Sequence, residues 1–464
     1  MLPLLAAIAM TVDDLKPLPP LPSKRQLAWH QMKRYCFVHF GPNTFTGKEW
    51  GTGNEATEVF NPKLLDCHQW CRAFKAAGFE GVIVTAKHHD GFCLWPSKFS
   101  THTVAQSPWK NGKGDVLKEL SQACRDEDLK FGVYLSPWDR NHPTYGTPQY
   151  NDTFKSMLKE VLTHYGPVFE VWFDGANGEG PNGKRQVYDW PGFIKVVRDC
   201  QPNAVIFSDA GPDIRWVGNE SGYAGETNWN MIDRSRFVIG ASDQKALNVG
   251  DENGPDWVPA ECDVSIRPGW FWRASEDSKV KSVQELMDIW YGSVGRGANL
   301  LLNVPPNSDG LISDVDVKRL AEFDQALKKE LSNEAGLADV EGIAPGGSVL
   351  VPAKELFEPK EKSYWNDAET NWAGHLKFTF PAETTVDRVV LEEPVAIGQR
   401  IKKFHIHTAD RANGYKTLAT GTTIGVRRVV KIPPTKLKEI WIQIDESRAV
   451  PALRRVRFYN TGHS

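Results

Sequence analysis

The chain has 464 residues, of which 41% are hydrophobic and 24% are charged, and its formal net charge is −3. This length is too great for one compact core, so we expect two domains. The near balance of 55 basic and 58 acidic residues gives no reason to expect a nucleic acid or an anionic membrane as partner, and it suits an uncharged ligand better. No stretch is long and apolar enough to span a bilayer.

Cysteine and tryptophan usage narrows the class further. The 7 Cys residues are odd in number and all precede position 263, which disfavours a dense disulfide framework. The only closely spaced pair, Cys67 and Cys71, is a weak indication of zinc. The chain also holds 17 Trp residues. Most tryptophans belong to protein cores, but the flat apolar ring also stacks on the apolar faces of sugars.

The N-terminus has the character of a lead-in and not of a folded domain. Residues 1–10 (MLPLLAAIAM) resemble the apolar middle of a signal peptide, although the preceding positive segment is missing. Residues 16–24 (KPLPPLPSK) are proline-rich and should be extended. We therefore interpret residues 1–25 as a lead-in with a signal remnant, and we expect a periplasmic or secreted protein.

Strand-like and helix-like runs alternate from residue 26 to about residue 340. The strand candidates are short, apolar and mostly unalternating, as strands buried on both faces should be. They are residues 36–40, 81–86, 131–135, 169–173, 204–207 and 299–304. The amphipathic runs are 62–77, 116–127, 152–165, 191–199, 283–294 and 314–331, the first with Asn61 as its expected N-cap.

This alternation predicts a (β/α)8-like, TIM-type barrel over residues 26–340. A doubly wound sheet is the alternative, but the turn at residues 41–44 (GPNT), after the first strand, is not a dinucleotide fingerprint. The pattern changes around residues 342–348 (GIAPGGS). Short strand-like runs follow at 376–380, 386–391, 403–408, 426–432 and 439–444. They predict an antiparallel β-sandwich over residues 341–464.

Polar residues stand at the ends of five successive strands of the predicted barrel. In parallel barrels, function collects at the C-terminal ends of the strands. One polar strand end is usually a turn or a helix cap, but five in chain order are harder to explain in that way. They are His39, the run at 87–90 (KHHD), Tyr134 with the following 136–139 (SPWD), Asp174, and Ser208 with Asp209.

Asp174 is the most informative of these residues. The next helical pattern starts near Trp190, too far along for Asp174 to be its cap. A carboxylate at a strand tip beside aromatic rings suits attack on a sugar carbon, and glycoside hydrolysis needs a second carboxyl group to protonate the leaving oxygen. Its candidates are Asp209, Asp213, Glu220, Glu226, Glu261 and Asp263. The spacing alone does not select Glu220, which lies in a loop beside Trp216, over Glu261.

The histidines His39, His88 and His89 have two interpretations. With Asp90 they could bind a metal, or they could hydrogen-bond a neutral polyol. Adjacent residues on a strand point to opposite faces, so His88 and His89 cannot both point inward if the strand still runs there. Metal-dependent barrel hydrolases more often carry His-x-His on one strand. We therefore expect no metal.

Taken together and in order, these motifs resemble the α-L-fucosidases of glycoside hydrolase family 29, over roughly residues 26–331. The matching pieces are 39–41 (HFG), 49–50 (EW), 88–92 (HHDGF), Tyr134, 172–175 (WFDG) and 295–303 (GRGANLLLN). The pieces 216–220 (WVGNE) and 261–270 (ECDVSIRPGW) further resemble the subgroup specific for branched α-1,3/1,4-fucosides. The C-terminal part resembles the galactose-binding-like sandwich that often follows this barrel.

The resemblance implies a retaining mechanism through a covalent fucosyl-enzyme, no cofactor, and a fucosylated glycan of Lewis type as substrate. Asp174 matches the nucleophile, and Glu220 matches the acid/base of the subgroup. The residues that match the fucose-binding positions, or are expected to line the same site, are His39, Glu49, Trp50, His88, His89, Tyr134, Trp172, Arg267 and Phe271. Of these, Trp172 and Phe271 are expected to form the apolar wall near the methyl group of the sugar.

Three other functions stay open at this point. The first is another retaining glycosidase on a similar barrel. The second is a metal-dependent hydrolase that uses the three histidines and Asp90. The third is an inactive sugar-binding protein, against which the presence of both carboxylates counts.

Overall fold

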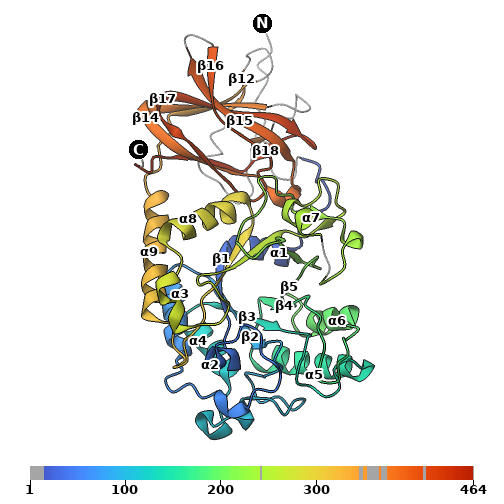
Figure 1. The fold of residues 1–464 in the computed structure, drawn as a ribbon. Helices are drawn as coiled ribbons and strands as arrows, with labels where there is room; N and C mark the ends of the chain where they lie inside the picture. Colours follow the sequence, from blue (N-terminus) through green and yellow to red (C-terminus); the bar gives the residue numbers. More distant parts are fainter. Residues whose placement is uncertain are drawn as a thin grey trace.

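The computed structural model describes residues 15–240, 243–343, 349–352, 365–366, 374–410 and 414–462. The chain forms two stacked parts (Figure 1): a barrel with its helices, and an antiparallel sheet, coloured orange to red, that covers one side of it. Among the described residues, no helix has the length and apolar character needed to cross a membrane.

Eight parallel strands close into a barrel in the order β1-β10-β9-β6-β5-β4-β3-β2. They are β1 (Arg34–Val38), β2 (Gly81–Lys87), β3 (Lys130–Leu135), β4 (Glu170–Trp172), β5 (Val205–Ser208), β6 (Ile214–Trp216), β9 (Ala260–Ser265) and β10 (Asn299–Asn303). Nearly all of their residues are buried, because the barrel interior and the outer helices leave these strands no solvent-facing side. The predicted (β/α)8-like barrel is confirmed.

Two of the eight strands, β6 and β9, were missed by the sequence analysis because they carry charged residues. Arg215 lies in the middle of β6, and its guanidinium donates to the backbone carbonyls of Leu247 (2.8 Å) and Trp229 (2.9 Å). Glu261 and Asp263 lie in β9 and are also buried. Internal hydrogen-bond partners make these charges compatible with a strand core, which an apolar pattern cannot reveal.

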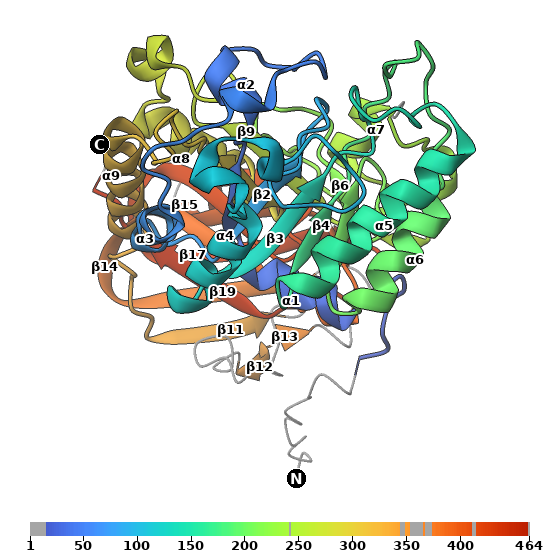
Figure 2. The ribbon, with the colours of Figure 1, turned by 90° about the horizontal axis from the view of Figure 1, so that it is seen from below.

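The helices lie outside the barrel, and Figure 2 shows α3 to α6 on the outer side of β2, β3 and β4. They are α1 (Lys24–Met32), α2 (Pro42–Thr46), α3 (Cys67–Ala76), α4 (Val116–Asp126), α5 (Pro148–His164), α6 (Trp190–Cys200), α7 (Gln244–Val249), α8 (Val283–Gly292) and α9 (Asp314–Glu330). The expected cap of α3 at Asn61 is wrong. Asp66 caps this helix, because its side chain accepts the N–H of Gln69 at 3.1 Å.

The C-terminal part is built on a seven-stranded antiparallel sheet. Its strands are β11 (Asp339–Ile343), β12 (Val349–Pro352), β14 (Gly374–Glu392), β15 (Ile401–Asp410), β16 (Gly414–Gly421), β17 (Arg428–Ser447) and β19 (Arg455–Tyr459). Two strand pairs lie apart from it: β13 (Trp365–Asn366) with β18 (Ala452–Leu453), and β7 (Met231–Ile232) with β8 (Asp256–Trp257).

This sheet confirms the predicted antiparallel C-terminal domain. Each of the long strands β14 and β17 joins two runs that the sequence analysis separated. β11 starts at Asp339, just before the predicted domain boundary, and most of the predicted transition, residues 344–348, lies outside the described residues.

A buried ion pair fixes the end of β2 to the loop after β3. The ammonium of Lys87 lies 3.1 Å from Asp139 Oδ2, and both side chains are at most 1% exposed. The other carboxylate oxygen accepts the backbone N–H groups of Asn141 (3.0 Å) and His142 (2.8 Å). Burial alone would raise the pKa of Asp139, but Lys87 and these two N–H groups outweigh it and lower that pKa below its ordinary value.

We expect Lys87→Met to lower the free energy of unfolding by about 3–5 kcal/mol, because it leaves the Asp139 carboxylate buried without its counter-charge. Urea unfolding at pH 7 measures this. The matched control is Lys195→Met, which breaks an exposed pair with Asp199 and should change stability by less than about 0.5 kcal/mol. Equal effects of the two substitutions would contradict the account. Because the pKa of Asp139 is lower in the folded chain, the wild-type pair should lose its contribution only as the pH falls below about 4.

Candidate active site

Asp174 lies just past the end of β4, and three groups surround its carboxylate. The hydroxyl of Tyr134 donates to Oδ2 at 3.0 Å, and the backbone N–H of Ala176 donates to Oδ1 at 2.7 Å. Nε2 of His89 lies 3.7 Å from Oδ2. The Asp174 side chain remains 26% exposed. The carboxylate is therefore held in one orientation while a substrate can still reach it.

Three histidines line the site beside Asp174. Nδ1 of His39 lies 2.9 Å from Asn303 Oδ1, and Nδ1 of His89 lies 2.8 Å from Ser136 Oγ. The rings of His88 and His89 lie 4.2 Å apart, and the His88 ring stacks with Tyr134 at 5.8 Å. The alternation argument against both His88 and His89 does not apply, because β2 ends at Lys87.

All three imidazoles are held in the neutral form. Burial lowers the pKa of His39 to about 3 and that of His89 to about 4, and it lowers the pKa of His88 well below its ordinary value. Neutral imidazole both donates and accepts hydrogen bonds, as a sugar hydroxyl requires. Across the part of the chain that the structure describes, no group of three or more His, Cys, Asp or Glu side chains is arranged to hold a metal ion.

Aromatic side chains form the walls of the site. Trp172 stacks on Phe207 with ring centroids 4.0 Å apart, and Phe271 lies edge-on to His39 at 5.4 Å and to His88 at 5.1 Å. Trp50 is 55% exposed and lies edge-on to His89 at 5.8 Å. The first two rings are thus enclosed, whereas Trp50 stands at the rim.

Glu49 is tied to the segment that follows β9. It accepts the backbone N–H of Trp270 at 2.5 Å and pairs with Arg273 at 2.6 Å. Trp270 in turn packs its ring on His39, with centroids 5.0 Å apart. The loop that carries Glu49 and Trp50 is therefore linked through Trp270 to the three histidines that line the site, called the histidine wall below.

Glu220 lies in the loop after β6. Its side chain is exposed, and the indole N–H of Trp270 donates to its carboxyl group at 3.4 Å. Partial burial of the carboxyl raises the pKa of Glu220, the negative charges of Asp174 and Glu49 add to this rise, and the Trp270 hydrogen bond opposes it. Asp174 and Glu49 are therefore close enough to Glu220 to act on its carboxyl group.

Glu261, another candidate for the second carboxyl group, lies elsewhere. It is fully buried in the barrel, where Tyr35 donates to one oxygen and the Trp172 indole donates to the other at 2.8 Å. Its carboxyl lies beneath Trp172 and away from solvent. The structure thus separates the two glutamates that the spacing left equivalent.

Arg267 is not brought into this cluster, contrary to the expectation that it lines the site. Its side chain is fully buried and donates to Asp316 Oδ2 and to Ser313 Oγ, both at 2.9 Å. A third contact joins it to Asp277 at 2.9 Å. These contacts hold the guanidinium against the start of α9, where it anchors the segment that precedes Trp270.

Sequence reasoning missed several residues that complete the site. Trp270 contacts Glu49, Glu220 and His39, and the ring of Trp138 lies 4.8 Å from that of His89. Asn303 orients His39. Trp270 and Asn303 lie inside the motif pieces quoted above, and Trp138 lies in the run at 136–139 that follows the third predicted strand, so these pieces were the available signal.

A family model described as Alpha-L-fucosidase matches residues 22–330 of this chain. The chain therefore belongs to the α-L-fucosidase family. Alpha-L-fucosidase 1 of Arabidopsis thaliana is 42% identical to it over 98% of this chain and 91% of the relative. The crystal structure of SpGH29 superimposes with a TM-score of 0.90 at 38% identity, covering 96% of this chain and 99% of that one.

A third relative is a GH29 fucosidase of Ruminococcus gnavus that was solved in complex with fucose. It superimposes with a TM-score of 0.87 at 32% identity, covering 96% of each chain. The resemblance to glycoside hydrolase family 29 is thus confirmed, and the protein is a glycoside hydrolase of the α-L-fucosidase type.

We expect the imidazole signals of His39, His88 and His89 to show no titration in NMR spectra between pH 5 and pH 8, since burial lowers the pKa of His39 to about 3, that of His89 to about 4, and that of His88 well below its ordinary value. A midpoint near pH 6.5 for any of the three would contradict the buried, neutral wall; single His→Gln variants assign the signals. Because these pKa values are lower in the folded chain than in the unfolded one, their protonation should lower stability as the pH falls below about 6.5.

Proposed function

We propose that this α-L-fucosidase is a retaining enzyme, with Asp174 as nucleophile and Glu220 as acid/base. The observation that carries the proposal is the contrast between the two carboxyl groups. Asp174 sits among donors that stabilise a negative charge. Glu220 lies near Asp174 and Glu49, and its raised pKa favours the protonated form that a general acid needs.

In the first step, an oxygen of Asp174 bonds to the anomeric carbon of fucose as the glycosidic C–O bond breaks, and the proton of Glu220 passes to the leaving oxygen. In the second step, Glu220 takes a proton from water, and the water oxygen replaces Asp174 at the same carbon. Two inversions give net retention. This mechanism works with carboxyl groups about 5–5.5 Å apart.

The neutral histidine wall supports the recognition of fucose in this proposal. His39, His88, His89, Tyr134 and Glu49 present donors and acceptors for the sugar hydroxyls. A sugar that lacks one of these hydroxyls would leave a buried polar group unpaired, which discriminates strongly between substrates. The apolar rings of Trp172 and Phe271 form a wall suited to the methyl group of fucose.

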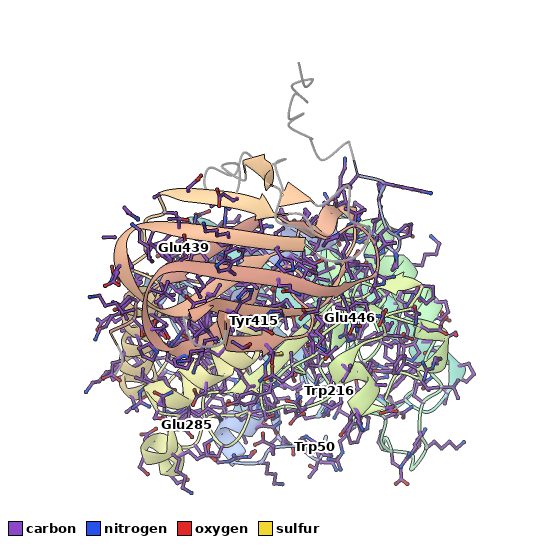
Figure 3. All side chains as sticks on the ribbon, turned by 90° about the horizontal axis from the view of Figure 1, so that it is seen from above. Trp50, Trp216, Glu285, Tyr415, Glu439 and Glu446 are labelled. Carbon is purple, nitrogen blue, oxygen red and sulfur yellow. The ribbon has the colours of Figure 1, made fainter. Side chains whose placement is uncertain are left out.

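For the substrate, we propose terminal fucose on α-1,3 or α-1,4 branches of Lewis-type glycans. The support is the subgroup-like sequence around Glu220 and Trp270 and the aromatic rim of the site. Trp50, which is 55% exposed and lies at the lower side of the molecule in Figure 3, offers a flat surface beside the fucose site for the leaving sugars. We also propose a periplasmic or secreted location, which rests on the apolar residues 1–10, outside the described residues.

The direct test compares the wild type with Asp174→Ala and Glu220→Ala on a Lewis-type trisaccharide and on an aryl α-L-fucoside with a good leaving group. Asp174→Ala should lose activity on both substrates. Glu220→Ala should lose about 10²–10⁴-fold in kcat/KM for the trisaccharide and much less for the aryl fucoside, because kcat/KM reports the first step, in which only the natural leaving group needs protonation. NMR of the first product should show α-fucose.

Three results would contradict parts of this proposal. A first product of β configuration would refute retention. Full activity of Glu220→Ala on the trisaccharide would refute its acid/base role. Release of fucose from the aryl fucoside alone, with none from the trisaccharide, would refute the proposed substrate.

A further inference from the structure

We propose that the C-terminal domain positions Glu220 for catalysis by clamping Glu226, which makes Arg428 and Arg296 positioning residues of the fucosidase reaction. The inference rests on the proposed acid/base role of Glu220. It concerns the segment from Val217 to Asn230, which connects β6 to β7 and is called the Glu220 loop below.

The loop backbone, and not a side-chain network, determines where Glu220 lies. The Glu220 side chain is exposed, and its hydrogen bond to Trp270 is long, at 3.4 Å. Next to it, Asn219 folds the chain into a compact turn. Its side-chain oxygen accepts the N–H of Ser221 at 3.1 Å, and its amide donates to the carbonyl of Tyr223 at 2.8 Å. A displacement of the turn would therefore move Glu220 with it.

Two arginines bind Glu226, which lies later in the same loop. Arg428, the first residue of β17, lies 2.6 Å from Glu226 Oε2 and also donates to the Glu226 carbonyl at 2.7 Å. Arg296 pairs with Oε1 and donates a second bond, of 2.6 Å, to the carbonyl of Ala224. One carboxylate thus joins the barrel, the Glu220 loop and the C-terminal domain.

Further hydrogen bonds from the C-terminal domain hold the same stretch of the loop. The Thr422 hydroxyl donates to the Glu226 carbonyl at 2.9 Å, and Thr423 accepts the N–H of Asn228 at 2.8 Å. Gln399 bonds to the backbone of Asn228 (3.1 Å) and of Asn230 (2.8 Å). The stretch of the loop from Glu226 to Asn230 is therefore anchored on the C-terminal domain, whose sheet lies over the barrel in Figure 1.

The chemistry explains why such anchoring matters. A general acid acts only within hydrogen-bond reach of the leaving oxygen, and a displacement of about 1 Å costs about 10²-fold in rate. Because no buried partner locks the Glu220 carboxyl, the precision has to come from the backbone that carries it.

The test uses Arg428→Met in the full-length enzyme, with Arg388→Met as its matched control. Arg388, in β14, pairs across the same domain interface with Glu330 at 3.0 Å and with Tyr291 at 2.7 Å, but these partners lie on α9 and α8 and not on the Glu220 loop. Both substitutions remove one arginine that joins the domains. Only Arg428→Met releases the loop.

We expect Arg428→Met to lower kcat/KM for the Lewis-type trisaccharide about 10-fold and that for the aryl fucoside less than about 2-fold, a smaller version of the Glu220→Ala signature. Arg388→Met should change neither value by more than about 2-fold. A purely structural role would lower kcat/KM for both substrates alike. Glu226→Gln provides a second variant, because Glu226 is 66% exposed and its neutral replacement is compatible with folding; we expect a loss of about 3-fold on the trisaccharide alone.

Two different failures can be told apart. Suppose that Glu220→Ala shows the dependence on leaving group. If Arg428→Met then has the same kcat/KM values as Arg388→Met, or lowers kcat/KM equally for both substrates, the clamp is refuted and the proposed function stands. If Glu220→Ala itself shows no such dependence, the acid/base assignment falls and the clamp falls with it. Should thermal unfolding show that Arg428→Met does not fold, Glu226→Gln decides, and an unchanged trisaccharide rate for it would overturn the inference.

Discussion

Closure of the barrel is the constraint on which the site depends. β1 pairs with β2 on one side and with β10 on the other, and only this closure brings the first and last strands into contact. The functional contacts then join the ends of different strands. Asn303 of β10 orients His39 after β1, and Tyr134 of β3 donates to Asp174 after β4. Residues far apart in the chain thus form one polar wall, and the contact between Asn303 and His39 would not exist in an open sheet.

Below the site, a second network of polar side chains lies in the barrel interior. Trp29 donates to Tyr35 at 2.7 Å and to Glu170 at 3.2 Å, Tyr35 donates to Glu261, and Glu261 accepts the indole N–H of Trp172. Burial raises the pKa of both Glu170 and Glu261, with a rise from the neighbouring carboxylate added at Glu170. Burial thus disfavours the ionised form of both carboxyl groups. The network holds Trp172 from below. Glu261 is therefore a buried residue that supports the site, whereas Glu220 is exposed.

The sequence predicted those features that depend on local pattern. Apolar strands followed by polar residues indicated the barrel and the positions of Asp174, His39, His88 and His89, because strand ends in a closed barrel converge. It missed β6 and β9, since Arg215, Glu261 and Asp263 interrupt the apolar pattern and find their partners only in the folded chain. Arg267 lies in a motif piece but binds Asp316 across the fold, which spacing cannot show. The clamp at Glu226 depends on residues about 200 positions apart and had no local signal.

The most direct test of the account is covalent trapping of the nucleophile. A 2-deoxy-2-fluoro-α-L-fucosyl fluoride carries a good leaving group, while its C2 fluorine destabilises the charged transition states, so the fucosyl-enzyme should accumulate. Mass spectrometry of proteolytic peptides should then show one added 2-fluorofucosyl group, on the peptide that contains Asp174, and none in the Asp174→Ala variant. Labelling of Glu220 or of another carboxylate, or turnover of the probe without any covalent adduct, would contradict the assignment of Asp174 as the nucleophile.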